Sequence, residues 1–471
     1  MDSGRGRAEA AGGDLWALDL CEGVERVWAG EMSCARWVNA VLERARATEP
    51  RLHAFSELDQ EGATRAAELL DEEFRRVRVE DGGALAEKYP LAGAAISIKD
   101  TLNCRGLWTT AGSAWFRKKG VRDADVVKRL RAAGALIIGK TVAHEFGFGV
   151  NRVTTLSPWG EELYTGGSSA GSGVSVGVGS SVASVGTDAG GSIRIPAALN
   201  GIVGLRPTPR RIPEGGHLPM SPSTGTVGPL AKSVDDCEVL YSVMSGRPRA
   251  SALGGRDPRR AERVGPKVGI IEELWLDNRP VDSRLREVCQ SLMSGDVGLE
   301  VVSVSLPMLG DVKALQLTLM LAEAAAIHHS QVGAHWLEYS PQVRAMLEHG
   351  AIISAVDYLE AQTTRRRFGA AVRRTMAHYN LQGLVHPTVP LEAAPLDRLG
   401  STLSTKGSTM DAYVEDSFVA SVASLPALAV PVGLGRSRLP VSLEIIGRTD
   451  GEPELFKIGR ALESRFSVRA A

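Results

Sequence analysis

The stretch GTDAGGSIRIP, residues 186–196, contains the turn on which the interpretation of this chain depends. Small residues fill its first half, whereas Ile193, Ile195 and Pro196 tie its second half to buried structure. Backbone N–H groups in such a turn can converge on one point, which is what a developing oxyanion needs during acyl transfer. The stretch therefore predicts an oxyanion-binding loop in which a side chain larger than alanine would crowd the site.

Two segments upstream of this turn supply further groups for acyl transfer. GGSSAGS, residues 166–172, places Ser168 behind two glycines, which permit backbone shapes closed to other residues. Lys99 ends the small, apolar run 92–98, which predicts a buried strand. Burial lowers the pKa of a lysine, and a neutral lysine can accept a proton from a serine hydroxyl. Asp100 would oppose this shift, but successive strand side chains face opposite ways.

In this order, the three segments resemble the amidase signature family, whose members carry a lysine, GGSS(G/A)GS and GTDxGGSIRxPA at similar separations. The matches continue on both sides and cover roughly residues 30–465. They are SIKD at 97–100, TAGS at 110–113, GKT at 139–141, EF at 145–146, GLRPT at 204–208, GPLAK at 228–232 and LPVSLEIIG at 439–447. We therefore expect an α/β protein with the amidase signature fold, a large twisted mixed β-sheet covered by helices on both faces.

The resemblance also implies a role for each site residue. Ser192 corresponds to the nucleophile, Ser168 to the bridging serine and Lys99 to the base of a Ser-Ser-Lys triad. The predicted oxyanion hole consists of Ala189, Gly190, Gly191 and Ser192, and the predicted supporting residues are Ser169, Asp188 and Arg194. The family also implies a cis peptide bond between Gly167 and Ser168. The resulting cycle forms a serine acyl-enzyme, which water hydrolyses.

Two other motifs in the chain suggest different chemistry. GALIIGKT, residues 134–141, matches the phosphate-binding pattern GxxxxGK[ST], yet its variable residues favour a buried strand over an anion-wrapping loop. GSSAG, residues 167–171, matches a nucleophile elbow centred on Ser169. No apolar strand precedes that elbow, but candidate partner histidines exist. They are His217, His328, His329, His335, His349, His378 and His386.

Composition excludes several classes of function. The 471 residues carry 54 Lys and Arg against 55 Asp and Glu, so no net positive field favours binding to nucleic acid. The five cysteines are scattered without metal-ligand spacing, and there is no HExxH motif, so we expect no cofactor and no metal. No signal peptide or membrane span is evident, which predicts a cytoplasmic protein.

The pattern along the chain predicts a mobile tail at residues 1–13 and one amidase signature domain at 14–471. Within it we expect N-terminal helices at 14–80, a catalytic core at about 85–245 and a variable, substrate-side region at about 300–420. Periodicity predicts helices at 15–29 and at 34–48, the second ended by Pro50. The charged, turn-rich stretch 254–267 is predicted to be a surface connection or an insertion and is the best candidate for an internal boundary.

The expected function is hydrolysis of an amide bond in a small molecule, and an apolar or aryl acyl group is preferred. Alternatives are an amidotransferase A-type subunit that releases ammonia for charged tRNA, a biosynthetic acyl transferase and an inactive binding protein. The tyrosine-rich segment of that subunit is not evident near 314–329, and the filled triad disfavours the inactive protein. Either a monomer or a homodimer is expected. Departures from the family pattern occur at Ala170, Arg206, Lys232, Ala423 and Ser424.

Overall fold

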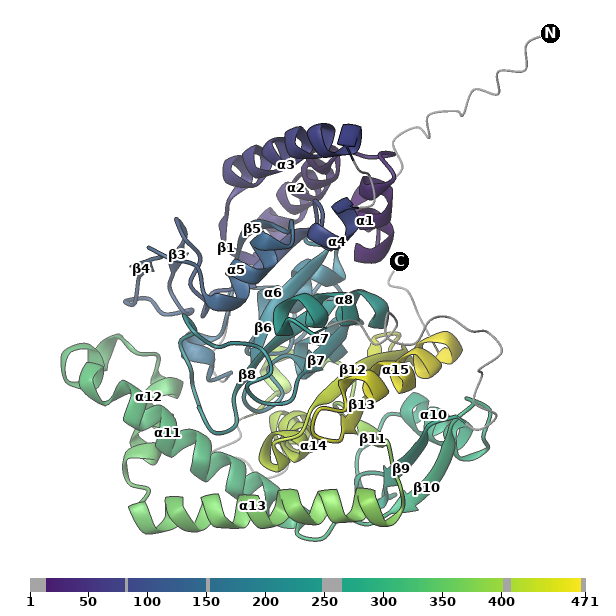
Figure 1. The fold of residues 1–471 in the computed structure, drawn as a ribbon. Helices are drawn as coiled ribbons and strands as arrows, with labels where there is room; N and C mark the ends of the chain where they lie inside the picture. The colour runs from purple at the N-terminus through teal and green to yellow at the C-terminus, as the bar shows by residue number, and fades with distance from the viewer. Residues whose placement is uncertain (1–13, 81–83, 150–152, 248–264, 401–407, 467–471) are drawn as a thin grey trace.

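An eleven-stranded β-sheet runs through the whole molecule (Figure 1). The computed structural model describes residues 14–80, 84–149, 153–247, 265–400 and 408–466, so the predicted tail at 1–13 and most of the connection at 254–267 lie outside the described residues. In pairing order, the strands are β1 Phe55–Leu58, β5 Leu136–Thr141, β2 Ala95–Lys99, β6 Ala183–Asp188, β8 Thr226–Ala231, β7 Val203–Arg206, β12 Ala427–Leu434, β13 Pro440–Gly447, β11 Gly383–Pro387, β9 Lys267–Ile271 and β10 Glu300–Val304.

The sheet is mixed, as the sequence predicts. Strands β5, β2 and β6 are parallel neighbours, and so are β11, β9 and β10. The strands between these two groups pair antiparallel with their neighbours. A separate two-stranded ribbon joins β3 Trp108–Thr109 to β4 Lys118–Lys119. The parallel group that contains β2 and β6 carries two of the predicted site segments at its carboxyl ends.

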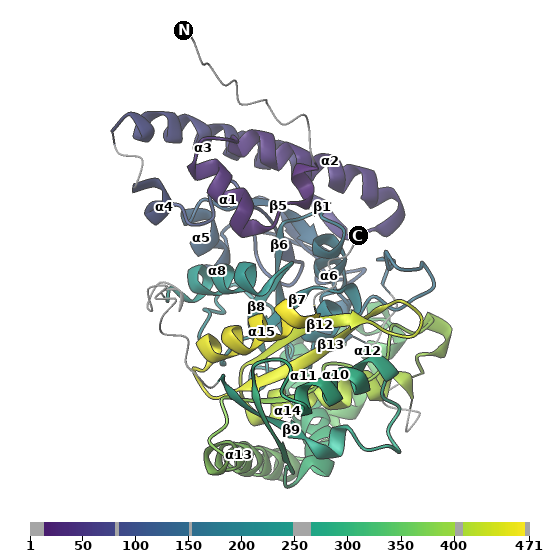
Figure 2. The same cartoon turned by 90° about the vertical axis from the view of Figure 1, so that its right-hand side faces the viewer.

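Helices cover both faces of the sheet, and side-chain alternation along the strands assigns the faces. Leu428, Val430 and Val432 of β12 enter the large core under α8, α10 and α15, whereas Ala427 and Ala429 belong to clusters on the opposite face. Figure 2 shows α15 lying across β12 and β13. The helices are α1 Leu20–Trp28, α2 Cys34–Leu52, α3 Gln60–Glu80, α4 Ala84–Lys88, α5 Asp125–Ala132, α6 Ala170–Gly177, α7 Arg194–Asn200, α8 Val234–Ser245, α10 Ser283–Met293, α11 Val312–His335, α12 Pro341–Ala351, α13 Ala355–His378, α14 Thr409–Ala423 and α15 Glu452–Phe466.

Helix α6 explains why the segment before the central turn is rich in glycine and serine. A Cβ atom on Gly171 would lie 2.1 Å from the carbonyl oxygen of Ala54, and one on Gly173 would lie 3.0 Å from that of Pro196. Larger side chains would therefore push α6 away from its neighbours. This tight packing holds the amino end of α6 against the sheet, beside the carboxyl end of β2.

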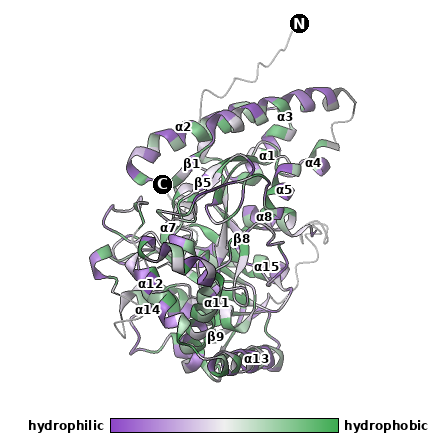
Figure 3. Cartoon of the chain, turned by 90° about the vertical axis from the view of Figure 1, so that its left-hand side faces the viewer, coloured by the Kyte–Doolittle hydropathy of each residue, from purple (hydrophilic) through white to green (hydrophobic). Residues whose placement is uncertain are grey.

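The N-terminal helices differ from the prediction in two places. A short 3-10 turn at Leu15–Ala17 precedes α1, so the first predicted helix is broken before Leu20. Helix α2 also runs through Pro50 and ends at Leu52, so the predicted end at Pro50 is wrong. The Glu49 carboxylate accepts hydrogen bonds from the N–H groups of Ala54 and Phe55, which holds the last turn in place. Figure 3 shows hydrophobic and hydrophilic residues alternating along α2 and α3.

Helices α11, α12 and α13 form a helical arm at the end of the molecule opposite α2 and α3 (Figures 1 and 2). The two long helices of this arm are α11, which contains residues 313–328, and α13, which contains residues 355–376. Side chains on one side of α11 reach the sheet face that carries α14, and they include Leu315, Gln316 and Leu319. No helix of the described residues is both long enough and apolar enough to cross a lipid bilayer.

Candidate active site

The sheet topology brings the predicted site segments to one edge. Strands β2 and β6 are parallel neighbours, and the carboxyl ends of parallel strands meet at the same edge of a sheet. Lys99 is the last residue of β2 and Asp188 is the last residue of β6, after which the turn leads to Ser192 and α7. Ser168 lies just before α6. The three predicted triad residues thus come from three chain segments that converge at this edge.

Lys99 is completely buried and has two hydroxyl partners. Its Nζ donates hydrogen bonds to Ser168 Oγ at 2.7 Å and to Thr187 Oγ1 at 2.8 Å. Burial lowers the pKa of Lys99 from 10.5 to about 7, and the negative charge of Asp188 only partly opposes this shift. Asp100 faces away, as predicted, and its carboxylate accepts a hydrogen bond from Lys140 at 2.8 Å. A substantial fraction of Lys99 is therefore neutral near pH 7.

The segment before α6 presents Ser168 to Lys99. The peptide bond between Gly167 and Ser168 is cis, as the family resemblance implies. The carbonyl oxygen of Ser168 accepts a hydrogen bond from the N–H of His144 at 3.1 Å. A Cβ atom on Gly167 would lie 2.5 Å from the His144 ring, so only glycine fits at that position. Ser169 occupies the N-cap position of α6 without making a side-chain cap, and its hydroxyl donates to the carbonyl oxygen of Thr187 at 3.4 Å.

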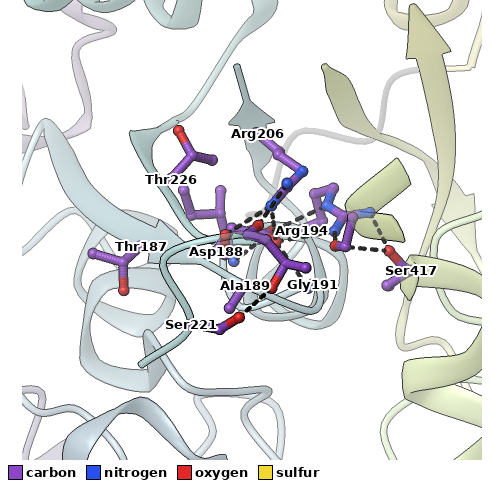
Figure 4. Close-up of polar contacts among 12 residues, drawn as sticks. Thr187, Asp188, Ala189, Gly191, Arg194, Arg206, Ser221, Thr226 and Ser417 are labelled. Atoms are coloured by element: carbon purple, nitrogen blue, oxygen red, sulfur yellow. Dashed lines mark hydrogen bonds and ion pairs between the residues drawn. The ribbon is translucent and has the colours of Figure 1, made fainter. Parts of the chain in front are cut away.

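Asp188 holds the turn that carries Ser192. Its buried carboxylate accepts hydrogen bonds from the N–H groups of Gly191 at 2.9 Å and Ile193 at 3.1 Å. Figure 4 shows this carboxylate between the guanidinium groups of Arg194 and Arg206. Burial by itself raises the pKa of Asp188, but the two arginine charges outweigh it and keep that pKa below its usual value. Asp188 is thus an ionised brace of the turn.

Arg194 connects this brace to strand β13 and helix α14. The completely buried guanidinium contacts the carboxylate of Glu444 in β13 and donates to the carbonyl oxygen of Ser417 at 2.8 Å. It also donates to Ser421 Oγ at 3.0 Å. Two acidic and two basic side chains therefore balance their charges without solvent, in a network that spans β6, α7, β7 and β13.

A pocket opens between Ser168 and Ser192, and both serines line it together with Ala189. Ser192 is half-buried, whereas Ser168 is buried. The cavity volume is about 20 Å³, which is slightly more than one water molecule needs. A Cβ atom on Gly147 would lie 3.6 Å from Ser168 Oγ, so glycine keeps this side of the pocket open. The remaining walls include Phe146, Glu214, His217, Leu218, Pro219 and Met220.

The two competing motifs have structural explanations. Residues 136–141 of the phosphate-loop pattern form the buried strand β5, as their apolar character predicts. Lys140 of that pattern is buried in an ion pair with Asp100 and so has no free ammonium group for a nucleotide. The residues that lead into Ser169 form turns and isolated bridges, so the strand that a nucleophile elbow requires is missing there. Within the described residues, no group of His, Cys, Asp or Glu side chains is arranged to hold a metal ion.

Several residues of the site escaped the sequence analysis. Thr187 is the second hydroxyl partner of Lys99, and Glu444 is the second carboxylate partner of Arg194. The position of Glu444 could have been noticed in the sequence, because a single acidic residue within an apolar strand indicates a buried ion pair. His144 lies close to Lys99, and burial together with the positive charge of Lys99 lowers the pKa of His144 to about 3. His144 is therefore neutral at physiological pH.

A buried lysine paired with a serine at the edge of a mixed sheet, next to a glycine-rich turn held by Asp188, defines the class of this protein. The chain belongs to the amidase family, whose model, described as Amidase, matches residues 36–456. It is accordingly an amide-hydrolysing enzyme with the amidase signature fold, and the family and fold predicted from the sequence are confirmed.

The chain is similar over nearly its whole length to proteins that are named for different activities. It is 31% identical to the A-type subunit of glutamyl-tRNA(Gln) amidotransferase from Roseiflexus sp., over 95% of this chain and 96% of the relative. It is 29% identical to mandelamide hydrolase of Pseudomonas putida, over 96% of this chain and 92% of the relative. Among solved structures, one described as an amidase aligns with a TM-score of 0.84 and 31% identity, and the alignment covers 96% of this chain and 100% of that chain.

Proposed function

We propose that this amidase hydrolyses a small-molecule amide through an acyl-enzyme on Ser192, with Ser168 as the bridging residue and Lys99 as the base. The observation that carries the proposal is the 2.7 Å contact between Lys99 Nζ and Ser168 Oγ, made by a completely buried lysine. The pocket beside this pair is lined by Ser168 and Ser192, so an amide carbonyl can enter next to the proton relay. The products are a carboxylate and ammonia or an amine.

In the first half of the cycle, Ser192 forms a bond to the substrate and Lys99 becomes protonated. Neutral Lys99 accepts the Ser168 hydroxyl proton while Ser168 accepts the proton of Ser192, whose Oγ bonds to the carbonyl carbon. The negative charge then develops on the carbonyl oxygen. The N–H groups of Ala189, Gly190 and Ser192 are assigned to that oxygen, whereas the N–H of Gly191 already donates to Asp188.

The second half returns the proton and releases the products. The Lys99 ammonium passes a proton through Ser168 to the departing nitrogen, and the C–N bond breaks. Water then attacks the acyl-enzyme, and the same relay removes a proton from the water and returns one to Ser192. The second partner of Lys99, Thr187, can orient the Nζ group during both transfers.

The pocket supports a small substrate with an apolar acyl part. Its walls include Phe146, Leu218 and Met220, and because its volume of about 20 Å³ is close to that of one water site, these side chains must move to admit an acyl group. The name mandelamide hydrolase, carried by a relative, is consistent with an aryl acyl group. We therefore include both aliphatic and aryl amides in the first substrate panel.

Mass spectrometry of the protein after exposure to a fluorophosphonate tests the nucleophile. We expect the wild type to be labelled on Ser192, and Ser192→Ala and Lys99→Ala to lose both labelling and turnover of amides. The matched control is Ser294→Ala, because Ser294 is exposed and lies on a different surface element. Labelling on Ser169 that persists in Lys99→Ala would instead identify an elbow hydrolase.

A second candidate function is an amidotransferase A-type subunit, which the similarity to the Roseiflexus protein supports. Such a protein would release ammonia preferentially from glutamine and would act in a complex. Ammonia release from glutamine, compared with release from the panel of small amides, separates the two functions.

Addition of hydroxylamine tests a third candidate, an acyl transferase, because capture of the acyl group would yield a hydroxamate in place of the acid.

A further inference from the structure

The walls of the pocket beside Ser192 have two chemical parts. Apolar groups come from Phe146, Leu218 and Met220, whereas Glu214 and His217 contribute polar groups from one loop. The apolar part has an evident role in contacting an acyl chain, which the proposed function already uses. The polar part has no role in the proton relay, because Lys99 hydrogen-bonds to Ser168 and Thr187.

The Glu214 carboxylate has no hydrogen-bonding partner among the described residues. The Glu214 side chain is half-buried, and its buried Oε1 accepts no hydrogen bond from the described part of the chain. Burial raises the pKa of Glu214, although the charges of Arg206 and Arg210 act in the opposite direction. A buried acceptor without a partner is unfavourable, so Oε1 calls for a hydrogen-bond donor from outside the protein.

The basic groups near Glu214 form no hydrogen bond or ion pair with it among the described residues. Arg210, the first of the two charges that act on Glu214, is an exposed side chain. The Arg206 guanidinium donates to the carbonyl oxygens of Asp188 and Thr224, at 2.7 and 2.6 Å. Burial and the Lys99 charge lower the pKa of His217 to about 3, so this ring is neutral at physiological pH. Neither residue therefore supplies a cation that hydrogen-bonds to Glu214.

The loop that carries Glu214 is fixed next to the catalytic lysine. The N–H of Leu218 donates to the carbonyl oxygen of Thr101 at 2.9 Å, two residues after Lys99. The carbonyl oxygens of Gly215 and Gly216 accept hydrogen bonds from the N–H groups of Asp125 at 2.8 Å and Asn103 at 2.9 Å. Because three backbone hydrogen bonds hold the loop, Glu214 stays at the pocket without a ligand.

We propose that Glu214 binds a positively charged amino group of the substrate, so that the enzyme prefers amides whose apolar acyl part carries an ammonium group. This inference rests on the proposed function, because it concerns the substrate of the same pocket. An ammonium group supplies hydrogen-bond donors and a positive charge to the Glu214 carboxylate. The adjoining carbons of the substrate then contact Phe146, Leu218 and Met220.

Two matched pairs of amides test the proposal, with the ammonium group at different distances from the carbonyl. The pairs are L-leucinamide with 4-methylpentanamide, and 5-aminopentanamide with pentanamide. The ratio of kcat/KM within each pair is measured near pH 7 for the wild type, Glu214→Gln and Glu68→Gln. Glu68 is an exposed acidic residue of α3 and serves as the matched control.

We expect the wild type and Glu68→Gln to favour the ammonium member of at least one pair by about tenfold or more, because charge-assisted hydrogen bonds are the strong ones. In Glu214→Gln this preference should fall to about one, whereas Glu68→Gln keeps the wild-type kcat/KM for 4-methylpentanamide and pentanamide. Fluorophosphonate labelling of Ser192 should continue at the wild-type rate in Glu68→Gln, and labelling of Ser192 in Glu214→Gln shows whether its nucleophile still reacts.

The outcomes separate this inference from the proposed function. If the uncharged amides are hydrolysed and Ser192 is labelled, but no pair shows an ammonium preference that depends on Glu214, the role of Glu214 is wrong and the amidase mechanism stands. If no amide is hydrolysed and Ser192 is not labelled, the proposed mechanism fails together with the inference. An ammonium preference that persists in Glu214→Gln would assign the recognition to another residue.

Discussion

Gln316 in α11 donates a hydrogen bond from Nε2 to the carbonyl oxygen of Ala189 at 3.0 Å. The same amide donates to Thr224 Oγ1 at 3.3 Å, and its side chain is completely buried. In a planar trans peptide the C=O and the following N–H point in opposite directions. By fixing the Ala189 carbonyl, Gln316 directs the N–H of Gly190 away from α11, and this N–H is one of the donors assigned to the oxyanion.

Gln316→Leu tests whether this contact positions the oxyanion loop. We expect kcat to fall about 10-fold to 100-fold, because loss of a well-placed oxyanion donor typically costs 10²–10³ and a misdirected donor costs less. KM should change little, since the effect concerns the transition state. Steady-state kinetics on a hydrolysed amide measure both constants. Gln331→Leu, an exposed position on the same helix, is the control, and an equal loss there would contradict the role of Gln316.

The activity should rise with pH through a single ionisation near pH 7. Only neutral Lys99 accepts a proton, and burial lowers its pKa to about 7, so kcat/KM should increase tenfold per pH unit below that value and level off above it. The neighbouring rings of His144 and His217 have pKa values lowered to about 3 and so stay neutral throughout this range.

Measurement of kcat/KM between about pH 5 and pH 10 checks this profile. The exposed Lys119→Met is the control and should retain the wild-type profile. A rate that is constant from about pH 6 to pH 8 would assign the base to another group.

Removal of the buried lysine should cost activity without costing stability near neutral pH. The unfolded chain binds a proton at Lys99 below pH 10.5, but the folded protein binds it only below about pH 7. As pH falls between these values, the free energy of unfolding of the wild type therefore decreases relative to Lys99→Met. The relative decrease amounts to roughly 4 kcal/mol. Denaturant unfolding of both proteins near pH 7 and pH 10 measures it, and an unchanged difference would contradict the shift.

The buried charge network should be sensitive to the loss of one partner. Glu444→Gln leaves the guanidinium charges of Arg194 and Arg206 opposed by Asp188 alone. Breaking such a buried pair typically costs about 3–5 kcal/mol, which denaturant unfolding can detect. The surface pair of Glu22 and Arg26 is the control, and Glu22→Gln should cost at most about 1 kcal/mol. Equal losses in both variants would show that burial does not govern the effect.

Much of the site could be predicted because its residues lie in short segments whose local sequence pattern indicates their structure. The apolar run before Lys99 indicated a buried strand, and alternation along it separated Lys99 from Asp100. The same reasoning identified β5 as a strand, although residues 134–141 match the phosphate-binding sequence pattern. The family resemblance added the order of the motifs and the cis bond before Ser168, which spacing alone would not give.

The residues that escaped prediction act across long sequence separations. Gln316 contacts Ala189 from a helix in the variable region, and Glu444 reaches Arg194 from a strand near the end of the chain. Neither pairing follows from periodicity, because the sheet order is needed to bring the elements together. The end of α2 differs from the prediction for a local reason, because the Glu49 carboxylate accepts hydrogen bonds from amides just beyond the helix and holds the turn after Pro50.

The glycine and serine packing of α6 divides the active site into a part that resists change and a part open to it. Added atoms on Gly167 or Gly171 would strike neighbouring groups, so mutational libraries aimed there would chiefly yield misfolded proteins. The pocket wall from Glu214 to Met220 lies on a surface loop and carries no reacting atom. We expect substitutions in that loop to change substrate preference while Lys99, Ser168 and Ser192 keep their positions.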